Sequence, residues 1–197
     1  PGTTGEKDFR TEGGSFLPEH ADIKEAKRLL AEAGWPDGKN FPKVSYKYNS
    51  NPGNKIIAEI LQGMWKKNLG IEVELLNEEW KVFLETRKKG DFEIAREAWI
   101  LDFNDAANLL ETFISTSPQN DNGYNNPEYD KLMRAAAYEM DSVKRINFLH
   151  EAEKVLMEDM PVIPIYFYSS ARMQSERVKN IYKSPRGYIF FRAAEKQ

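Results

Sequence analysis

The chain has 197 residues, a formal net charge of −3, 41% hydrophobic residues and 30% charged residues, values typical of one folded domain and not of a disordered chain. Acidic and basic residues are interspersed without a basic block, which argues against nucleic-acid binding. Cysteine is absent, which excludes disulfides, cysteine zinc sites and thiol catalysis. The sequence contains no run of about 18 apolar residues, the length needed to span a membrane.

The first twenty residues are expected to form a loop or hinge arm (1–20), because glycine and proline are frequent there and hydrophobic periodicity is missing. The opening residues, PGTTGEKDF, resemble neither a signal peptide nor a natural initiation site. They predict that the chain is a segment of a larger protein.

Helices and strands are predicted to alternate through the first half of the chain. In order, they are a helix over 22–33, a strand over 44–48, a helix over 53–69, a strand over 71–76, a helix over 80–89 and a strand over 92–99. Asp22 and Asn77 are the expected caps of the first and third helices. The second helix is expected to bury an apolar face made of Ile56, Ile57, Ile60, Leu61, Met64 and Trp65.

This order predicts a parallel sheet with right-handed crossovers. In open sheets of this type, ligands bind beyond the carboxyl ends of the strands. The loop after the third strand, residues 100–105, is therefore where binding chemistry is expected.

The second half of the chain is predicted to be mainly helical, with two further strands near its end. The expected elements are a helix over 106–114, a polar loop over 115–125, a helix over 126–139, the longest helix over 141–160, an apolar strand over 161–168 and a final strand over 188–192. Asn126 and Asp141 stand where helix caps are expected.

The stretch around the third strand combines the groups needed to hold a short zwitterionic chain. Asp102 supplies a carboxylate for an ammonium group, and Arg87 and Arg96 supply guanidinium groups for a carboxylate. Trp80 and Trp99 supply indole faces for side chains. This combination indicates capture of a solute and not catalysis.

Five phrases of the sequence resemble, in family order, the extracellular solute-binding protein family 5, which includes the oligopeptide- and dipeptide-binding proteins of ABC importers. The phrases are AKRLLAEAGWPDG (26–38), MWKKNLGIEV (64–73), the stretch 79–105, GYNNPEYDKL (123–132) and AEKVLMEDMPVIPIYFY (152–168). Together they cover roughly residues 21–179.

The resemblance implies an α/β fold, namely one lobe of a periplasmic-binding-protein-like (type II) architecture with a mixed, mainly parallel sheet flanked by helices. It implies that residues 1–20 form the hinge arm and that residues 21–180 form the C-terminal ligand-binding lobe. Residues 181–197 are then a tail strand that returns to a first lobe preceding residue 1.

The implied function is to capture oligopeptides between two lobes, by their backbone and termini, and to deliver them to the permease of an ABC importer. The implied location is extracytoplasmic, in a periplasm or lipid-anchored at the outer face of the cytoplasmic membrane. No cofactor, metal or enzymatic step is implied. The same fold hosts nickel complexes, oligosaccharides and cell-wall peptides, so the solute class stays open.

The resemblance also implies roles for single residues. Asp102, in the W-x-x-D step that begins at Trp99, takes the peptide ammonium group, and Arg96 meets carboxylate charge. Arg87 and Trp80 match positions that line the ligand cavity.

Two positions depart from the family pattern. Asn54 stands where some oligopeptide binders carry a histidine that meets the peptide carboxylate. Glu97 adds a negative charge near the site, where a small residue is common. Both departures leave the preferred peptide length open.

Structural interpretations stand beside these functional ones. Asp102 could form a turn or cap a helix, although Asn104 or Asp105 is the better candidate for the cap. Trp80 and Trp99 could each face either the core or the cleft.

Structural interpretations also exist for Arg87 and Arg96. Arg87, beside two lysines on a predicted helix, is typical of a solvated charge. Arg96 lies in the middle of a predicted strand, where an unpaired charge is costly.

A hydrolase and a bare interaction module remain as alternative functions. Against a hydrolase, no G-x-S-x-G motif is present, His20 lies in the arm and His150 has helical spacing. The polar loop over 119–123 lacks the spaced carboxylates of a calcium site, so no metal site is predicted. An interaction module would have no small-ligand pocket.

Overall fold

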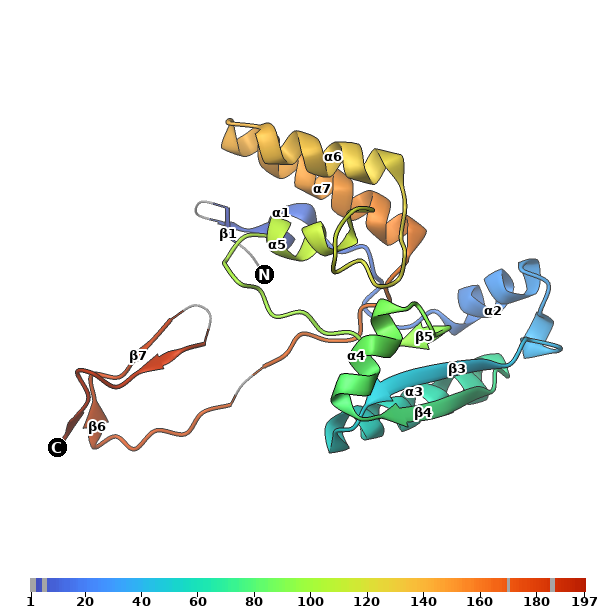
Figure 1. The fold of residues 1–197 in the computed structure, drawn as a ribbon, viewed down its shortest axis with the longest axis horizontal. Helices are drawn as coiled ribbons and strands as arrows, with labels where there is room; N and C mark the ends of the chain where they lie inside the picture. The colour runs from blue at the N-terminus through green and yellow to red at the C-terminus, as the bar shows by residue number, and fades with distance from the viewer. Residues whose placement is uncertain (1–2, 5–6, 170, 185–186) are drawn as a thin grey trace. The chain divides into compact units, whose positions relative to one another are not determined.

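The computed structural model describes residues 3–4, 7–169, 171–184 and 187–197. The chain divides into two compact units, whose elements are labelled in Figure 1. The sheet unit consists of residues 17–98 and 121–123, and the helical unit consists of the other described residues. Within the described residues, no helix combines the length and the hydropathy needed to traverse a bilayer.

The sheet unit contains a three-stranded parallel sheet in the order β4-β3-β5. The strands are β3 (Val44–Asn49), β4 (Val73–Glu78) and β5 (Ile94–Ala95). Tyr46, within β3, lies opposite Leu75 of β4 and opposite Ile94 of β5. The predicted parallel order is confirmed, but β5 has only 2 residues where the sequence predicts a strand over 92–99.

Three α-helices belong to the same unit. They are α2 (Ile23–Glu32), α3 (Pro52–Leu69) and α4 (Trp80–Lys88), with a 3-10 turn η1 (Pro36–Gly38) after α2. Helix α3 connects β3 to β4, whereas α4 connects β4 to β5 in the opposite direction across the sheet. Right-handed crossovers therefore place α3 and α4 on opposite faces of the sheet, as Figure 1 shows.

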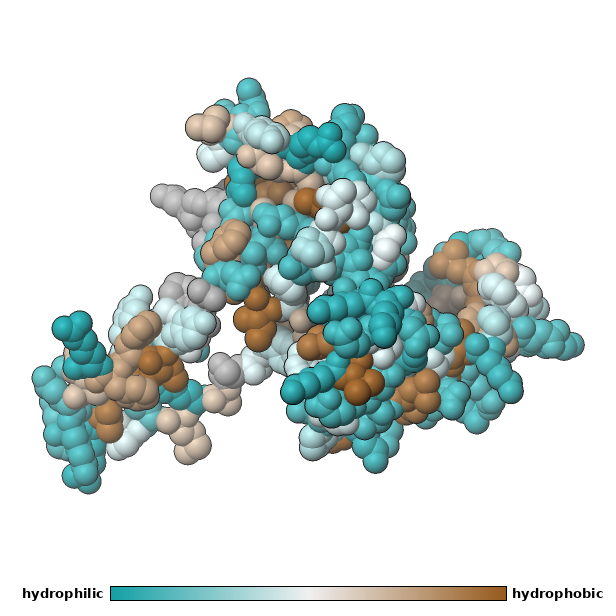
Figure 2. All heavy atoms as spheres, viewed as in Figure 1, coloured by the Kyte–Doolittle hydropathy of each residue, from teal (hydrophilic) through white to brown (hydrophobic). Residues whose placement is uncertain are grey.

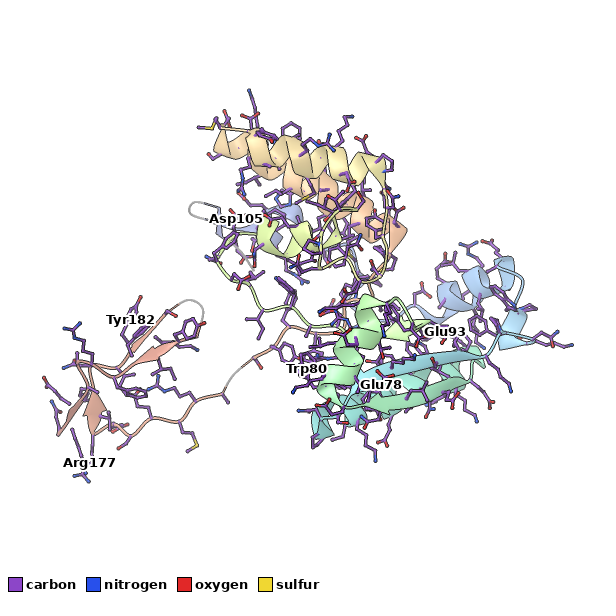
Figure 3. The ribbon with its side chains drawn as sticks, in the orientation of Figure 1. Glu78, Trp80, Glu93, Asp105, Arg177 and Tyr182 are labelled. Carbon is purple, nitrogen blue, oxygen red and sulfur yellow. The ribbon has the colours of Figure 1, made fainter. Side chains whose placement is uncertain are left out.

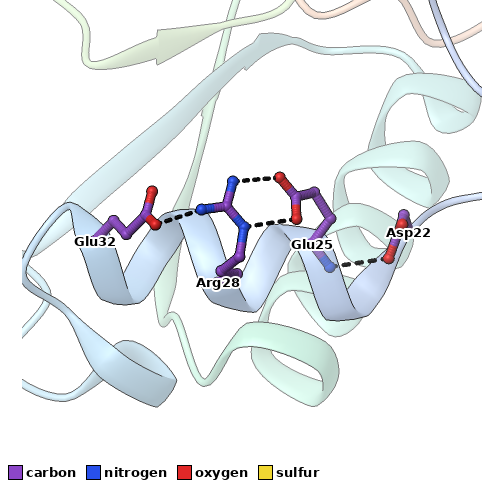
Figure 4. Close-up of polar contacts among 4 residues, drawn as sticks. All are labelled: Asp22, Glu25, Arg28 and Glu32. Atoms are coloured by element: carbon purple, nitrogen blue, oxygen red, sulfur yellow. Dashed lines mark hydrogen bonds and ion pairs between the residues drawn. The ribbon is translucent and has the colours of Figure 1, made fainter.

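Helix α2 begins as its sequence predicts. The Asp22 carboxylate accepts a hydrogen bond from the backbone N–H of Glu25 at 2.9 Å and so caps the helix. Further along α2, Arg28 pairs with both Glu25 and Glu32 on the exposed surface (Figure 4). Exposed pairs of this kind contribute little to stability, because water screens the charges and ordering two long side chains costs conformational entropy.

The predicted cap of α4 is wrong. Asn77 lies within β4, where its Oδ1 accepts a hydrogen bond from the Ser50 hydroxyl at 2.7 Å. Glu79 caps the helix instead, because its carboxylate accepts the backbone N–H of Lys81 at 2.8 Å. The strand continues past the residue at which the pattern predicts its end, so the helix start moves with it.

Helix α3 buries only part of the face that the sequence predicts. Asn54 and Ala58 are buried on this helix, and Leu61 and Trp65 pack against the core of the sheet unit. Three residues of the predicted inner face are exposed: Ile56, Ile60 and Met64. The sequence offers two apolar rows, and close packing around the small side chain of Ala58 selects one of them. Figure 2 shows hydrophobic residues, in brown, among the hydrophilic surface residues of the sheet unit.

The helical unit is built on a pair of long helices. Its helices after residue 99 are α5 (Ala107–Leu110), η2 (Glu111–Phe113), α6 (Pro127–Tyr138) and α7 (Ser142–Asp159). Asn126 and Asp141 cap α6 and α7, as predicted. Tyr129 of α6 is wholly buried, and its hydroxyl donates to the Leu110 carbonyl at 2.7 Å. This bond ties α6 to α5 inside the shared core.

The first twenty residues contain structure where the sequence predicts a loop. Strands β1 (Thr3–Thr4) and β2 (Lys7–Asp8) pair, and helix α1 (Phe9–Gly13) follows. Phe9 is buried in the core of the helical unit, where its ring stacks on His150 with the ring centroids 4.0 Å apart. One aromatic anchor thus orders a segment whose glycine content predicts a loop.

The predicted strand over 161–168 is absent from the described structure of that segment. Its large apolar side chains are exposed: Ile163, Ile165, Tyr166, Phe167 and Tyr168. Two short antiparallel pairs follow, β6 (Val178–Lys179) with β9 (Glu195–Lys196), and β7 (Tyr182–Lys183) with β8 (Ile189–Phe190). Strand β8 replaces the longer strand predicted over 188–192. A strand needs a paired edge, which the local sequence does not supply.

Candidate functional site

Three predicted site residues follow the carboxyl ends of the three parallel strands. Asn54 lies in the first turn of α3, after β3, and Trp80 begins α4, after β4. Arg96 directly follows β5. Parallel strands end at one edge of their sheet, and this is the edge at which open α/β sheets bind ligands. The topology therefore gathers these residues at one edge.

Asn54 uses its amide group within the fold. The side chain is buried, and its Nδ2 donates to the Oδ1 of Asn49 at 2.9 Å and to the Asn49 carbonyl at 3.3 Å. The Oδ1 of Asn51 accepts the backbone N–H of Asn54 at 3.4 Å and caps α3. These bonds fix the start of α3 to the end of β3.

Trp80 presents its indole to solvent. The residue, labelled in Figure 3, is 44% exposed. One side of its ring lies against Phe83, with 6.3 Å between the ring centroids. Phe83 is wholly buried. Trp80 is therefore not a core residue, and a ring that is half covered and half open can contact the side chain of a ligand.

Arg87 lies in a partly buried ion-pair cluster, so its interpretation as a solvated charge is wrong. Its side chain is 12% exposed and pairs with both Glu97 and Asp121, the latter at 2.6 Å. Its guanidinium group also lies 5.8 Å from the centroid of the Phe83 ring. One guanidinium between two carboxylates leaves an excess of negative charge, which disfavours a further carboxylate from a ligand.

Glu97 explains why the third strand is short. The last backbone hydrogen bond between this segment and β3 runs from the Arg96 N–H to the Lys47 carbonyl, at 2.8 Å. The Glu97 carboxylate then accepts the Ala98 N–H at 2.7 Å and pairs with Arg87. Burial raises the pKa of the Glu97 carboxyl above its usual value, and the Arg87 charge opposes that rise. Arg96 itself is half-buried.

Asp102 and Trp99 belong to the helical unit, in the loop before α5. Asp102 is exposed, and among the described residues none donates a hydrogen bond to its carboxylate. Asp105, one residue before the N-cap Ala106, supplies the capping hydrogen bond, because its Oδ1 accepts the Ala107 N–H at 2.8 Å. Trp99 is half-buried, and its Nε1–H donates to Asn108 at 3.4 Å. The interpretation of Asp102 as a helix cap is therefore wrong.

Two residues that sequence reasoning does not identify support this loop. Asn108, 7% exposed, accepts the backbone N–H of Asp102 on its Oδ1 at 2.8 Å. Arg145 of α7 donates to both carboxylate oxygens of Asp105, at 2.9 and 3.0 Å (Figure 3 marks Asp105). Arg145 and Asp105 are far apart in the sequence, so a local pattern cannot connect them. A polar residue among the apolar ones of α5 is the only local hint of Asn108.

The Asp105 carboxyl is held in its ionised form. Burial acts to raise its pKa, but hydrogen bonds from Arg145 and from the Ala107 N–H, together with the Arg145 charge, outweigh burial. The net result is a pKa below the usual value. The pair thus stays charged near neutral pH and fixes the start of α5 to α7.

A cavity of about 410 Å³ also lies within the helical unit. Its walls come from α5, η2, α6, α7 and the loop after η2, and they include Arg145 and Glu111 beside apolar residues such as Met133 and Leu149. The lining contains none of the six predicted site residues. The cavity is therefore distinct from the predicted site.

Comparison with known proteins identifies the family. The model of the bacterial extracellular solute-binding proteins, family 5 Middle, matches residues 3–121, which is more than half of the chain. The chain belongs to this family. The resemblance seen in the sequence is confirmed, and the family consists of extracellular proteins that bind solutes.

Two curated relatives in family 5 come from Bacillus subtilis. The oligopeptide-binding protein OppA is 39% identical over 178 residues, which cover 88% of the chain and 33% of the relative. The dipeptide-binding protein DppE is 37% identical over 191 residues, which cover 96% of the chain and 35% of the relative. The chain therefore spans about a third of the length of these relatives.

A solved family 5 structure shares the fold. The structure of Listeria monocytogenes OppA bound to peptide superimposes with a TM-score of 0.78 and 29% identity, covering 98% of the chain and 37% of that protein. The predicted fold class is confirmed: the chain has the α/β fold of the oligopeptide-binding proteins, with a parallel sheet flanked by helices.

Proposed function

We propose that the chain is the C-terminal ligand-binding lobe of a two-lobed protein that captures oligopeptides for an ABC importer. The observation that carries the proposal is the Asp102 carboxylate, which is exposed on a supported loop while Asp105 does the capping. A carboxylate in this position suits the α-ammonium group of a peptide. Similarity to OppA and DppE supports oligopeptides as the ligand class.

Capture in this proposal depends on excluding water between two lobes. A charge-assisted hydrogen bond between Asp102 and the ligand ammonium group would contribute about 1.5–3 kcal/mol. The open indole face of Trp80 would contact ligand side chains without selecting one chemistry. Recognition of the backbone and termini then lets many sequences bind, and no covalent step is involved.

Arg96 is the proposed partner of the ligand carboxylate, because it follows β5 at the ligand edge of the sheet. Arg87 and Asn54 belong to the wall of the proposed site. Arg87 holds Glu97 in place, and the Asn54 amide holds the start of α3. The charge of Arg87 is already balanced by acids of the protein.

The proposal includes the arm over 1–20, the lobe over 21–180 and a tail over 181–197 that returns to a first lobe. Exposed apolar side chains between 163 and 168 support a further covering surface in the complete protein. The permease of an ABC importer is the proposed partner. The proposed location is outside the cytoplasmic membrane, free in a periplasm or lipid-anchored.

Calorimetry on the full-length protein tests the proposal with a short peptide, its N-acetylated form and its C-terminally amidated form. Acetylation removes the ammonium charge, so it should weaken binding by about tenfold or more. Equal affinity for the free and acetylated peptides would exclude the ammonium contact. Binding of an oligosaccharide or a nickel complex in place of all peptides would exclude the peptide class.

The two-lobe part of the proposal has its own test. The 197-residue chain alone should bind peptide weakly or not at all, since in this proposal the other lobe supplies contacts that exclude water from the ligand. Micromolar or tighter binding by this chain alone would show that the site is complete without a second lobe.

A further inference from the structure

The loop that carries Asp102 is not part of a strand. Strand β5 ends at Ala95, and residues 96–102 have no regular secondary structure. A carboxylate that recognises an ammonium group must be held within a few tenths of an ångström, because charge-assisted hydrogen bonds are short and directional. Some other contact must therefore fix the loop.

The side-chain oxygen of Asn108 is that contact. It accepts the Asp102 backbone N–H at 2.8 Å and the Trp99 indole N–H at 3.4 Å. Both partners are donors, so the carbonyl oxygen and not the amide nitrogen of Asn108 must face them. One buried atom thus binds the loop at both ends of its W-x-x-D step.

Asn108 is itself held firmly. It lies on α5 between Ala107 and Leu110, two core residues of the helical unit. The start of α5 is fixed by Asp105, which accepts the Ala107 N–H and two hydrogen bonds from Arg145 of α7. A continuous polar chain therefore runs from α7 through Asp105 and α5 to the loop.

We propose that Asn108 is the positioning residue for recognition of the ligand amino terminus: its carbonyl oxygen fixes the loop from which Asp102 meets the ammonium group. This inference rests on the proposed function. Asn108 does not touch the ligand, and it acts through the backbone of Asp102. Its removal should lower the preference for a free amino terminus more than it lowers binding in general.

Thr112 provides a matched comparison. It is buried to the same extent, at 8% exposed against 7% for Asn108, and lies on the next turn of the same segment. Its hydroxyl donates to the Leu109 carbonyl at 2.7 Å, so its hydrogen bond stays within its own turn. Loss of a buried polar group at Thr112 should leave the Asp102 loop unaffected.

The experiment measures, on the full-length protein, the ratio of the Kd of an N-acetylated peptide to the Kd of the same peptide with a free amino terminus. Asn108→Leu keeps the side-chain shape and removes the acceptor, and it should lower this ratio about five- to tenfold. Asn108→Asp keeps an acceptor oxygen and should retain the ratio. Thr112→Val should also retain it.

A double-mutant cycle separates positioning from general stability. In an Asp102→Asn background, Asn108→Leu should change the ratio no further, because the group that it positions is gone. If the leucine variant does not fold, Asn108→Ser carries the test, since its short hydroxyl cannot reach both donors.

The outcomes distinguish this inference from the proposed function. An unchanged ratio in Asp102→Asn would overturn the ammonium contact and, with it, the positioning role. A lowered ratio in Asp102→Asn together with an unchanged ratio in Asn108→Leu would overturn the positioning role alone. An equal loss of affinity for both peptides in Asn108→Leu would show that Asn108 is purely structural.

Discussion

Arg87 in the sheet unit and Asp102 in the helical unit are both predicted to contact a ligand, yet the fold treats their charges in opposite ways. The Arg87 guanidinium is nearly buried between Glu97 and Asp121. The Asp102 carboxylate is exposed, and among the residues that the structure describes only the Asp102 backbone is held, by Asn108. A charge balanced by the protein stabilises the fold, whereas a charge left open on a fixed loop is available to a ligand.

Of the substitutions that test this contrast, one at Asp102 is expected to have the largest effect on affinity. Asp102→Asn in the full-length protein should weaken binding of a peptide with a free amino terminus by about 2–4 kcal/mol, because a desolvated ammonium group loses its counter-charge. The melting temperature should stay unchanged. Calorimetry checks the affinity, with Asp37→Asn, an exposed acid elsewhere, as the control. Unchanged affinity would remove Asp102 from the site.

Substitution of Arg87 should lower the stability of the fold and not the affinity for the ligand. Arg87→Met leaves Glu97 and Asp121 without their cation, and it should lower the free energy of unfolding by about 2–3 kcal/mol, less than for a fully buried pair because both acids retain some exposure. Urea denaturation measures this loss. Lys88→Met, at an exposed neighbour, should change stability by less than about 0.5 kcal/mol. A loss of affinity without a loss of stability would place Arg87 on the ligand.

Arg96 tests the other end of the ligand. Arg96→Met should weaken binding of peptides with a free carboxyl terminus by about 1–2 kcal/mol more than binding of amidated peptides. Paired calorimetric titrations measure this difference. Equal losses for the two ligands would mean that Arg96 is structural.

The Glu97 charge is expected to weaken binding of ligands that carry a carboxylate. Glu97→Gln removes one of the two acids that surround Arg87, so affinity for a free carboxyl terminus should rise by up to about 1 kcal/mol relative to the amidated peptide. The same paired titrations measure the change. If affinity for the free carboxyl terminus fell relative to the amidated peptide, the charge of this cluster would not act on the ligand.

The smallest effect concerns His150, a half-buried base whose ring nitrogens have no hydrogen-bond partner among the described residues. Burial lowers its pKa below the ordinary value of 6.5, and the Glu12 charge opposes this shift. The folded state therefore binds fewer protons than the unfolded state, so stability is lost as pH falls through 6.5 toward the lower folded pKa.

Urea denaturation between about pH 5 and pH 7 checks the contribution of His150 against His150→Phe, which keeps the stack on Phe9. The nearby Glu153 also titrates, since burial raises its pKa, and it remains present in both proteins. The wild type should lose more stability than the variant as pH falls. Parallel pH profiles would exclude His150 as the source.

Local sequence predicted the helices well, because their ends depend on residues a few positions apart. Asp22, Asn126 and Asp141 each accept backbone N–H groups from the first turn that follows them. Strands were predicted less well. Residues 92–99 and 161–168 both have apolar content typical of strands, but strand pairing depends on partners that are distant in the sequence. In the first of these segments, Glu97 pairs with Arg87 and is not part of the sheet.

The candidate site shows the same division. Strand order indicated the loop after the third strand as the binding region, whereas the family resemblance supplied the residues that follow the first two strands, Asn54 and Trp80. Sequence reasoning also favoured Asn104 or Asp105 over Asp102 as the cap. It did not find Asn108, Arg145 or Asp121. Each of these acts through a contact with a residue at least several positions away, and composition carries no trace of such contacts.

By itself, the sequence determined the order of helices and strands in the sheet unit, the parallel arrangement of its strands and the family, because periodicity, caps and motif order are local properties of the chain. Tertiary structure alone decided which face of α3 is buried, where β5 ends and which charges are balanced within the protein. The physical reason is that burial and ion pairing depend on groups brought together by folding, and the cost of leaving a buried charge unpaired selects among side chains that look equivalent in the sequence.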